Sequence, residues 1–266
     1  MLLESQLIIG FIFGLIIGFF SYRLKLLNLS GTIAAIGVAT IVYGFGGLQY
    51  TIPIITFFVL SSLLSKFRKY FSFDVETYFE KSGTRDYAQV LANGGLPIFI
   101  LLFHYFIQFE FAYHLYVASL CVAAADTWAT EIGTIKKAKT YNILSLKLIH
   151  QGTSGGVSLI GTIGASLGSL TISLSALPWI DTYHLYFIIS TFIVGIIGSF
   201  YDSLLGSTLQ AQYICGVCKK ITERKSHCEK GTSLYSGIKV FNNDVVNFTA
   251  SFLGTLTMFF ILSLIN

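Results

Sequence analysis

Long apolar runs are the feature that most constrains what this chain can fold into. Stretches of roughly 20 apolar residues follow one another along the sequence, and a helix of about that length crosses the ~30 Å hydrocarbon core of a bilayer. Only 11% of the 266 residues are charged, against about 25% in a typical soluble domain. The pattern predicts an all-α, polytopic membrane protein and excludes a soluble enzyme of ordinary composition.

The apolar runs predict about eight spanning helices in a single integral membrane domain that covers residues 1–266. No linker rich in Pro, Ser or charge divides the chain, and the alternating ten-residue runs typical of an outer-membrane barrel are absent from the sequence. The expected spans are 2–21, 31–47, 49–65, 88–108, 111–134, 155–176, 183–211 and 244–265. Little more than a few glycines and Gln49 separates the second span from the third, so seven spans are the alternative.

The basic residues predict the orientation of these spans. All 17 Lys and Arg fall in the segments that follow the first, third, fifth and seventh spans. The positive-inside rule assigns such segments to the cytoplasm. We therefore expect a protein of the cell inner membrane with both termini outside and its active site at the cytoplasmic face.

A weak internal repeat relates two glycine-rich spans. Ser30-Gly31 is followed by Gly37, and Ser154-Gly155 is followed by Gly161 at the same spacing, 124 residues later. An offset of four spans keeps the orientation, as in the parallel repeats of some transporters. The alternative is that Ser-Gly pairs simply recur in a glycine-rich membrane protein.

Polar residues that hydropathy does not explain gather at the predicted cytoplasmic ends of the spans. Acids at membrane depth are costly and commonly functional, and glycine-rich openings expose backbone N–H groups that suit phosphate. Carboxylates beside such segments, with Lys and Arg near, are what a magnesium–nucleotide or magnesium–diphosphate site needs. The pattern therefore favours a phosphate-handling site that is open to the cytoplasm and to lipid.

Roles follow from these residue types. We expect Asp126, Glu131 and Asp202 to be catalytic and, together with Asp244, to bind Mg²⁺ or orient an acceptor phosphate. The residues expected to bind phosphate are Arg85, Asn93, Gly94, Gly95, Thr130, Thr153, Ser154, Gly155, Ser203, Gln210 and Asn243.

Each of these elements also has a structural interpretation. A lone membrane acid can pack helices together or bind a coupling ion. The run Gly152 to Gly156 could be an interfacial turn, and Asn242-Asn243-Asp244 could be no more than a helix start, because Asn and Asp are favoured N-caps.

Taken in order, the motifs resemble the transmembrane protein 19 family, which includes the phytyl phosphate kinase of plant tocopherol synthesis. The resemblance covers about residues 83 to 250 and rests on five segments, which are Gly83-Thr84-Arg85-Asp86 with Asn93-Gly94-Gly95, Ala125 to Gly133, Gly152 to Ser158, Asp202 to Gln210 and Asn242 to Asn247. It implies Mg²⁺-dependent phosphoryl transfer from a nucleoside triphosphate, with CTP favoured, to an isoprenyl monophosphate of the phytyl or geranylgeranyl type. The implied partners are these two substrates and the lipid bilayer. No nucleic acid is expected, and an oligomer is compatible with the sequence.

A cysteine pair in the predicted cytoplasmic loop 212–241 indicates a second metal. A disulfide is disfavoured in the cytoplasm, where paired cysteines are better interpreted as metal ligands. Cys215, Cys218, His227 and Cys228 would make a Cys₃His zinc site. Against this, the adjacent His227 and Cys228 need not both reach one ion, and His227 could instead serve the phosphate site.

Two other classes of function remain open at this point. A secondary transporter would share the repeat and the membrane acids, but its site should lie near the bilayer midplane. A cytidylyl or CDP-alcohol-type transferase would also use acids at cytoplasmic helix ends, although the dense Asp-x-x-Asp-Gly run of the latter is missing. The near absence of polar residues on the predicted external side favours an interfacial enzyme.

Overall fold

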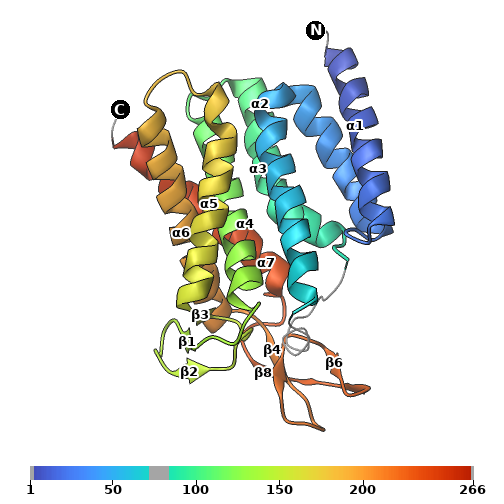
Figure 1. The fold of residues 1–266 in the computed structure, drawn as a ribbon, viewed down its shortest axis with the longest axis vertical. Coiled ribbons are helices and arrows are strands. Elements are labelled where there is room, and N and C mark those ends of the chain that lie inside the picture. The colour runs from blue at the N-terminus through green and yellow to red at the C-terminus, as the bar shows by residue number, and fades with distance from the viewer. Residues whose placement is uncertain (1–2, 72–83, 265–266) are drawn as a thin grey trace.

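The computed structural model describes residues 3–71 and 84–264, so that Gly83 of the first motif lies outside the described residues. The described part contains seven α-helices that run side by side as a bundle (Figure 1). They are α1 Leu3–Arg23, α2 Leu29–Lys69, α3 Tyr87–Ile107, α4 Ala112–Gly133, α5 Leu159–Ala176, α6 His184–Thr208 and α7 Asn243–Ser263. The predicted all-α polytopic class is confirmed.

Helix α2 contains two of the eight predicted spans, folded back on each other. Gly47 has a φ of +60° and interrupts the helical backbone, a conformation that glycine adopts without steric cost. Both ends of α2 lie at the same end of the bundle, because the Asn28 N–H donates to the Arg85 carbonyl (3.0 Å) and Arg68 forms an ion pair with Glu131 of α4. The helix is therefore a hairpin, and the described residues contain eight long helical segments.

Six of the described helices are long and apolar enough to cross a membrane by length and composition, and α4 is not one of them. Helix α4 nevertheless occupies the middle of the bundle, where it contacts α2, α3, α5, α6 and α7. Every residue from Leu115 to Ala125 is buried. Because its neighbours shield it from the surroundings, α4 can carry polar residues that a helix facing lipid could not.

Glycines of α5 let the backbones of α5 and α4 approach each other closely. A Cβ at Gly164 would lie 2.5 Å from the Trp128 carbonyl oxygen, and one at Gly168 would lie 2.6 Å from that of Ala124. Small residues at such positions let helices approach closely in membranes. The same contact fixes the acid-bearing end of α4 beside α5.

Short strands follow α4 and α6 at one end of the bundle, which the sequence pattern did not predict (Figure 1). One antiparallel sheet has the order β2-β1-β3, and the second has the order β5-β4-β8, beside a separate hairpin of β6 and β7. The strands are β1 Thr140–Asn142, β2 Leu148–Ile149, β3 Gly156–Val157, β4 Gln212–Ile214, β5 Ile221–Thr222, β6 Ser226–His227, β7 Lys230–Gly231 and β8 Ser233–Ser236, and the 3₁₀-helix η2 Leu177–Trp179 follows α5.

The first sheet corrects the predicted start of the sixth span. Helix α5 begins at Leu159, and its N-cap is Ser158, whose side chain accepts a hydrogen bond from the Gly161 N–H (3.0 Å). The run Gly152 to Gly156 therefore forms the turn before β3 and the start of that strand. Ser30-Gly31 lies instead in the first turn of α2, so the two Ser-Gly pairs differ in local structure and the internal repeat stays a prediction.

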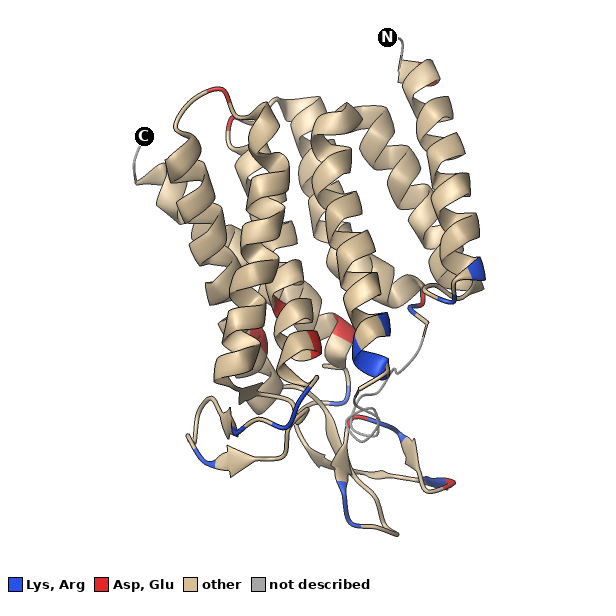
Figure 2. Cartoon of the chain, in the orientation of Figure 1, with Lys and Arg blue, Asp and Glu red and all other residues tan. Residues whose placement is uncertain are grey.

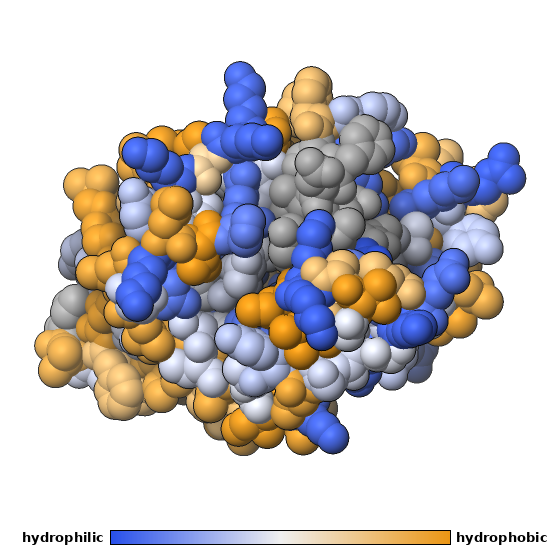
Figure 3. Space-filling model, turned by 90° about the horizontal axis from the view of Figure 1, so that it is seen from below, coloured by the Kyte–Doolittle hydropathy of each residue, from blue (hydrophilic) through white to orange (hydrophobic). Residues whose placement is uncertain are grey.

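The two ends of the bundle differ in their content of basic residues. Figure 2 shows Lys and Arg at the end that carries the strands, which we call the basic end. Seen from below, hydrophilic side chains project from this face, while apolar side chains lie around much of its margin (Figure 3). The polar residues singled out from the sequence lie on helix ends and loops here.

Candidate functional site

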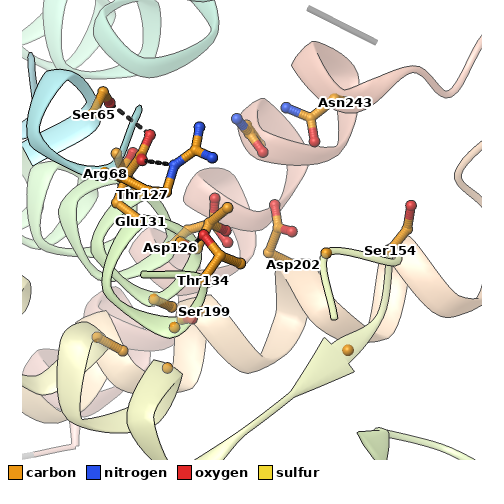
Figure 4. A pocket seen from close by; sticks show the side chains of 18 of the residues that line it. Ser65, Arg68, Asp126, Thr127, Glu131, Thr134, Ser154, Ser199, Asp202 and Asn243 are labelled. Carbon is orange, nitrogen blue, oxygen red and sulfur yellow. Dashed lines mark hydrogen bonds and ion pairs between the residues drawn. The ribbon is translucent and has the colours of Figure 1, made fainter. Parts of the chain in front are cut away.

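A cavity of about 620 Å³ lies at the basic end of the bundle. Its walls come from the ends of α2, α4 and α6, from the starts of α3 and α7, and from the loop that precedes α5 (Figure 4). The predicted site residues that line it are Arg85, Asn93, Asp126, Thr130, Glu131, Thr153, Ser154, Gly155, Asp202, Ser203, Gln210, Asn243 and Asp244. Segments separated by more than a hundred residues in sequence thus share one cavity.

The Asp126–Asp202 pair brings two carboxyl groups together across α4 and α6. The two carboxyl groups interact with each other, and the negative charge of Glu223 also acts on Asp202. The amide nitrogen of Asn247, on α7, donates to Asp202 Oδ2 (2.9 Å) when it is oriented toward its acceptors. Two carboxylates in contact repel unless they share a proton or a cation, and carboxylate oxygens are preferred ligands of Mg²⁺.

The Arg68–Glu131 pair lies on the neighbouring wall. Arg68 Nε donates to Glu131 Oε2, and Ser65 Oγ donates to Glu131 Oε1 at 2.6 Å (Figure 4). The Arg68 side chain is only 5% exposed. Both oxygens of Glu131 accept hydrogen bonds from α2, so the residue is a buried counterion that orients Arg68. That Glu131 also binds Mg²⁺ stays a prediction.

Arg85 enters the cavity from the segment before α3. The backbone N–H of Arg85 donates to the Leu26 carbonyl (3.0 Å), so the α1–α2 connection holds this residue in place. A Cβ at Gly31 would lie 2.3 Å from the Arg85 carbonyl oxygen, which is why this position of α2 requires glycine. Burial lowers the pKa of the Arg85 guanidinium, and the negative charge of Glu131 opposes that shift.

Further basic side chains accompany Arg85 on one side of the cavity. They are Arg23, Lys25, Lys66 and Lys69. Asp126 of α4 and Asp202 of α6 line the same cavity. We call these two acids its acidic wall and the five basic residues its basic wall.

The loop before α5 closes the cavity against α6. Gly155 has a φ of +78°, and a Cβ there would lie 2.5 Å from the Ser207 Cβ. Ser154, next to it, donates from Oγ to Glu223 Oε1 at 2.7 Å. The left-handed conformation and the close approach to α6 both require glycine at position 155.

Two predicted phosphate-binding residues do not line the cavity. Gly94 and Gly95 lie inside α3, which begins at Tyr87 after the N-cap Asp86, and the atoms nearest to a Cβ at Gly94 belong to Ile54 and Val38. Their backbone N–H groups are helical and do not form the exposed opening that the sequence suggested. The spacing of Asp86 and Gln89, which form a capping box, is the signal that places these glycines within a helix.

Three functional candidates were missed by the sequence analysis. Glu223, which is 8% exposed, follows β5 in a loop where one acid among many charged residues gives no pattern. Arg68 counted only toward the topology, and Ser65, which also donates to Glu131, was interpreted as an ordinary polar residue of an apolar span. A pairing between α2 and α4 was the missing information, because nothing in either segment alone identifies the other.

Gln210 has the environment of a ligand-binding amide. Its side chain is 3% exposed, and its Nε2 finds no hydrogen-bond partner among the described residues. A buried amide without a partner is costly, and Gln210 lines the cavity.

The four candidate zinc ligands gather at a separate place in the β4–β8 segment, with their ligand atoms all within 4.8 Å of one another. His227 belongs to this group and does not line the cavity. The doubt that His227 and Cys228 could face one centre is thereby removed.

Comparison with known proteins adds a family. Residues 12–255 match the model of the family "Integral membrane protein DUF92". The chain is 28% identical over 271 residues to "Protein PGR" of Arabidopsis thaliana, which covers 93% of each protein. It is also 28% identical over 194 residues to "Uncharacterized membrane protein MJ0933" of Methanocaldococcus jannaschii, which covers 71% of this chain and 77% of that protein. No solved structure matches the chain.

Proposed function

The chain belongs to the DUF92 family of integral membrane proteins, the transmembrane protein 19 family, and we propose that it is an isoprenyl monophosphate kinase. An oxygen of the isoprenyl monophosphate attacks the γ-phosphorus of a nucleoside triphosphate, for which the family resemblance favours CTP. The bond from that phosphorus to the β-phosphate oxygen breaks, so the products are the isoprenyl diphosphate and the nucleoside diphosphate.

The observation that carries this proposal is the pairing of an acidic wall with a basic wall in one cavity. Two phosphorylated substrates bring several negative charges into contact, and their repulsion must be offset before they can react. Arg85 and the lysines beside it supply cations, while Ser154, Gln210 and Asn243 supply neutral hydrogen-bonding groups. An apolar or purely acidic cavity would not hold such a pair of substrates.

The Asp126–Asp202 pair fits a divalent cation, because both residues line the cavity and no basic side chain of the described residues forms an ion pair with either carboxylate. Mg²⁺ bound there would neutralise charge on the transferred phosphoryl group. Asp244 and Glu223 stand close enough to the same cavity to adjust its charge. Glu131 acts indirectly, because its ion pair holds Arg68 in place on the neighbouring wall.

The chain needs no general base for this reaction. A phosphate monoester is already anionic near neutral pH, so positioning and charge neutralisation carry the catalysis. The basic wall binds and orients the two phosphate groups, and the buried Arg68 has its guanidinium fixed by Glu131 before any substrate arrives. Preorganised cations of this kind cost little reorganisation at the transition state.

An apolar side of the cavity supports a lipid-linked acceptor. Ala165 of α5 and Ile196 and Phe200 of α6 contribute to the lining next to the acids, and Phe200 is 38% exposed. An alkyl chain bound between these helices would leave its phosphate beside Asp202. A soluble sugar phosphate or nucleotide acceptor would have no use for that surface.

The orientation follows from the positive-inside rule. We infer that the basic end faces the cytoplasm of a cell whose inner membrane holds the protein, with both termini outside. The cavity then receives nucleotide from the cytoplasm and the acceptor from the inner leaflet. Because its charged residues lie at one end of the helices, the site suits an interfacial enzyme better than a transporter, whose site lies near the midplane.

The test is a transfer assay with purified protein in lipid nanodiscs. CTP, ATP, UTP and GTP, each labelled either in the α- or in the γ-phosphate, are offered with Mg²⁺ against phytyl, geranylgeranyl and farnesyl monophosphates. We expect label from the γ-position alone in the terminal phosphate of an isoprenyl diphosphate. Transfer of the α-label would instead establish a nucleotidyl transferase, and no transfer with any pair would overturn the kinase proposal.

A further inference from the structure

We propose that Cys215, Cys218, His227 and Cys228 bind one zinc ion, and that this ion holds the β4–β8 segment in the position that carries Glu223 into the cavity. The inference rests on residues outside the cavity and does not depend on the reaction proposed above. The fourth cysteine of the chain, Cys121, is buried in the middle of α4 and cannot take part.

The geometry of the four side chains suits a tetrahedral ion. His227 Nδ1 lies 3.4 Å from the sulfur of Cys218 and 3.2 Å from that of Cys228. Ligand atoms around tetrahedral zinc, at 2.0–2.3 Å from the metal, stand about 3.5–3.8 Å apart. The imidazole therefore faces the thiols through Nδ1. All four ligand atoms lie within 4.8 Å of one another, so small side-chain shifts around an ion would complete the site.

The backbone on both sides is shaped to present these ligands. Around the first pair, the Lys219 N–H donates to the Cys215 carbonyl and the Cys215 N–H donates to the Lys220 carbonyl, each at 3.0 Å. This compact turn directs both side chains to one point. It is followed at once by β5, which pairs with β4.

The second pair depends on an unusual turn. Cys228 and Glu229 connect β6 to β7 and have φ values of +51° and +58°, a conformation that two-residue hairpins normally fill with Asn or Gly. Residues with side chains are strained there and persist when other interactions hold them. A bond from Cys228 to a metal provides such an interaction, and the turn lets two consecutive residues ligate one ion.

The donor set selects the metal class. Three thiolates and one imidazole suit Zn²⁺, whereas Mg²⁺ and Ca²⁺ take oxygen ligands. A thiolate-rich zinc site carries a net negative charge, and Lys219 and Lys220 follow Cys218 directly in sequence. The acids of the cavity and the thiols of this cluster therefore bind different ions at different places.

Zinc at this cluster has a consequence for the cavity. Glu223 lies between the two ligand pairs, in the loop that the ion closes, and its carboxylate accepts the hydrogen bond from Ser154. The strands of this segment are two to four residues long and β8 is exposed along its whole length, so they bury too little apolar surface to be stable alone. A structural metal supplies the missing stability in small folds of this kind.

Metal content is the first test. Protein purified without chelators should carry about one zinc per chain, measured by inductively coupled plasma mass spectrometry. Replacing Cys215 and Cys218 by Ser should remove it, whereas Cys121→Ser, the matched control within α4, should retain it. Cobalt substitution should give the absorption of a tetrahedral thiolate complex. Metal-free wild-type protein that also fails to bind cobalt, or equal zinc in the double variant, would overturn the site.

Hydrogen exchange tests the link to the cavity without any variant that might misfold. Removing zinc from the wild-type protein with a strong chelator should speed amide exchange in residues 212–236 and also in 151–156, while 177–183 at the opposite end of the bundle should not respond. A response confined to 212–236 would refute the connection through Glu223 and Ser154. No response in either segment would show that the ion does not hold the loop.

Discussion

Two pairs of side chains on the last turns of α4 differ in a way that separates function from architecture. Asp126 faces Asp202, a residue of the same charge, whereas Glu131, five positions further on, faces the opposite charge of Arg68. The first pair repels itself and has no structural benefit. The second neutralises two buried charges and ties α4 to α2. Two acids at the same depth of the membrane can therefore have different roles, and the side chains that they contact distinguish these roles.

The largest expected effect comes from neutralising the like-charged pair. Asp126→Asn and Asp202→Asn should each lower phosphoryl transfer by about 10²-fold or more, because the carboxylate that holds the metal is lost while size is kept. The unfolding temperature should stay equal or rise, since a repulsive buried charge has been removed. Turnover at saturating Mg²⁺ and thermal unfolding in detergent measure the two quantities. Asp181→Asn, at an exposed acid between η2 and α6, is the control, and near-wild-type turnover in both variants would remove the pair from the site.

Breaking the ion pair should have a smaller effect on turnover and a larger one on stability. Glu131→Gln leaves Arg68 buried without its counterion, so the free energy of unfolding should fall by about 3–5 kcal/mol and turnover by roughly tenfold, as Arg68 loses its orientation. The double variant Arg68→Met with Glu131→Gln should be more stable than the sum of the two single losses predicts. Strictly additive losses would mean that the two side chains do not interact.

The smallest expected effect concerns the basic wall and uses two glycines of α2. Gly31→Ala directs a methyl group at the Arg85 carbonyl, whereas Gly37→Ala meets no atom within 4 Å. Both changes add one methyl group to the same helix, so the difference between them reports mainly the displacement of Arg85. We expect the KM for the nucleotide to rise by about threefold to tenfold in Gly31→Ala alone. Equal kinetics in the two variants would show that Arg85 does not contact the substrate.

Much of the fold could be predicted because the bilayer fixes the length of a spanning helix. The hydropathy runs gave α3 as 88–108 against Tyr87–Ile107, and the glycines near Gly47 marked the reversal inside α2. Strands such as β5, two residues long, are too short to show a periodicity. They form because the loops after α4 and α6 pair with themselves, and strands of two to four residues depend on partners that their own few residues do not reveal.

The site was predictable where its chemistry is rare and unpredictable where it is common. Asp126 and Asp202 stood out because acids seldom occur in apolar helices, and the cysteine spacing identified the second cluster. Glu223 lies in a charged loop, where acids are ordinary, and Arg68 ends a helix, where basic residues are ordinary. The error at Gly94 came from treating a glycine pair as exposed backbone when the capping box of Asp86 had already begun the helix.

The central position of α4 also sets an order of events when the chain is made. Synthesis delivers α2 and α3 before α4, and α5 to α7 after it, although all five of these helices surround α4 in the finished bundle. At the moment α4 emerges, Arg68 is already present to accept Glu131, but the helix that carries Asp202 does not yet exist. The amino-terminal half must therefore shelter α4 first. The acid pair is assembled later, when α6 arrives, and α7 then covers the remaining side of α4.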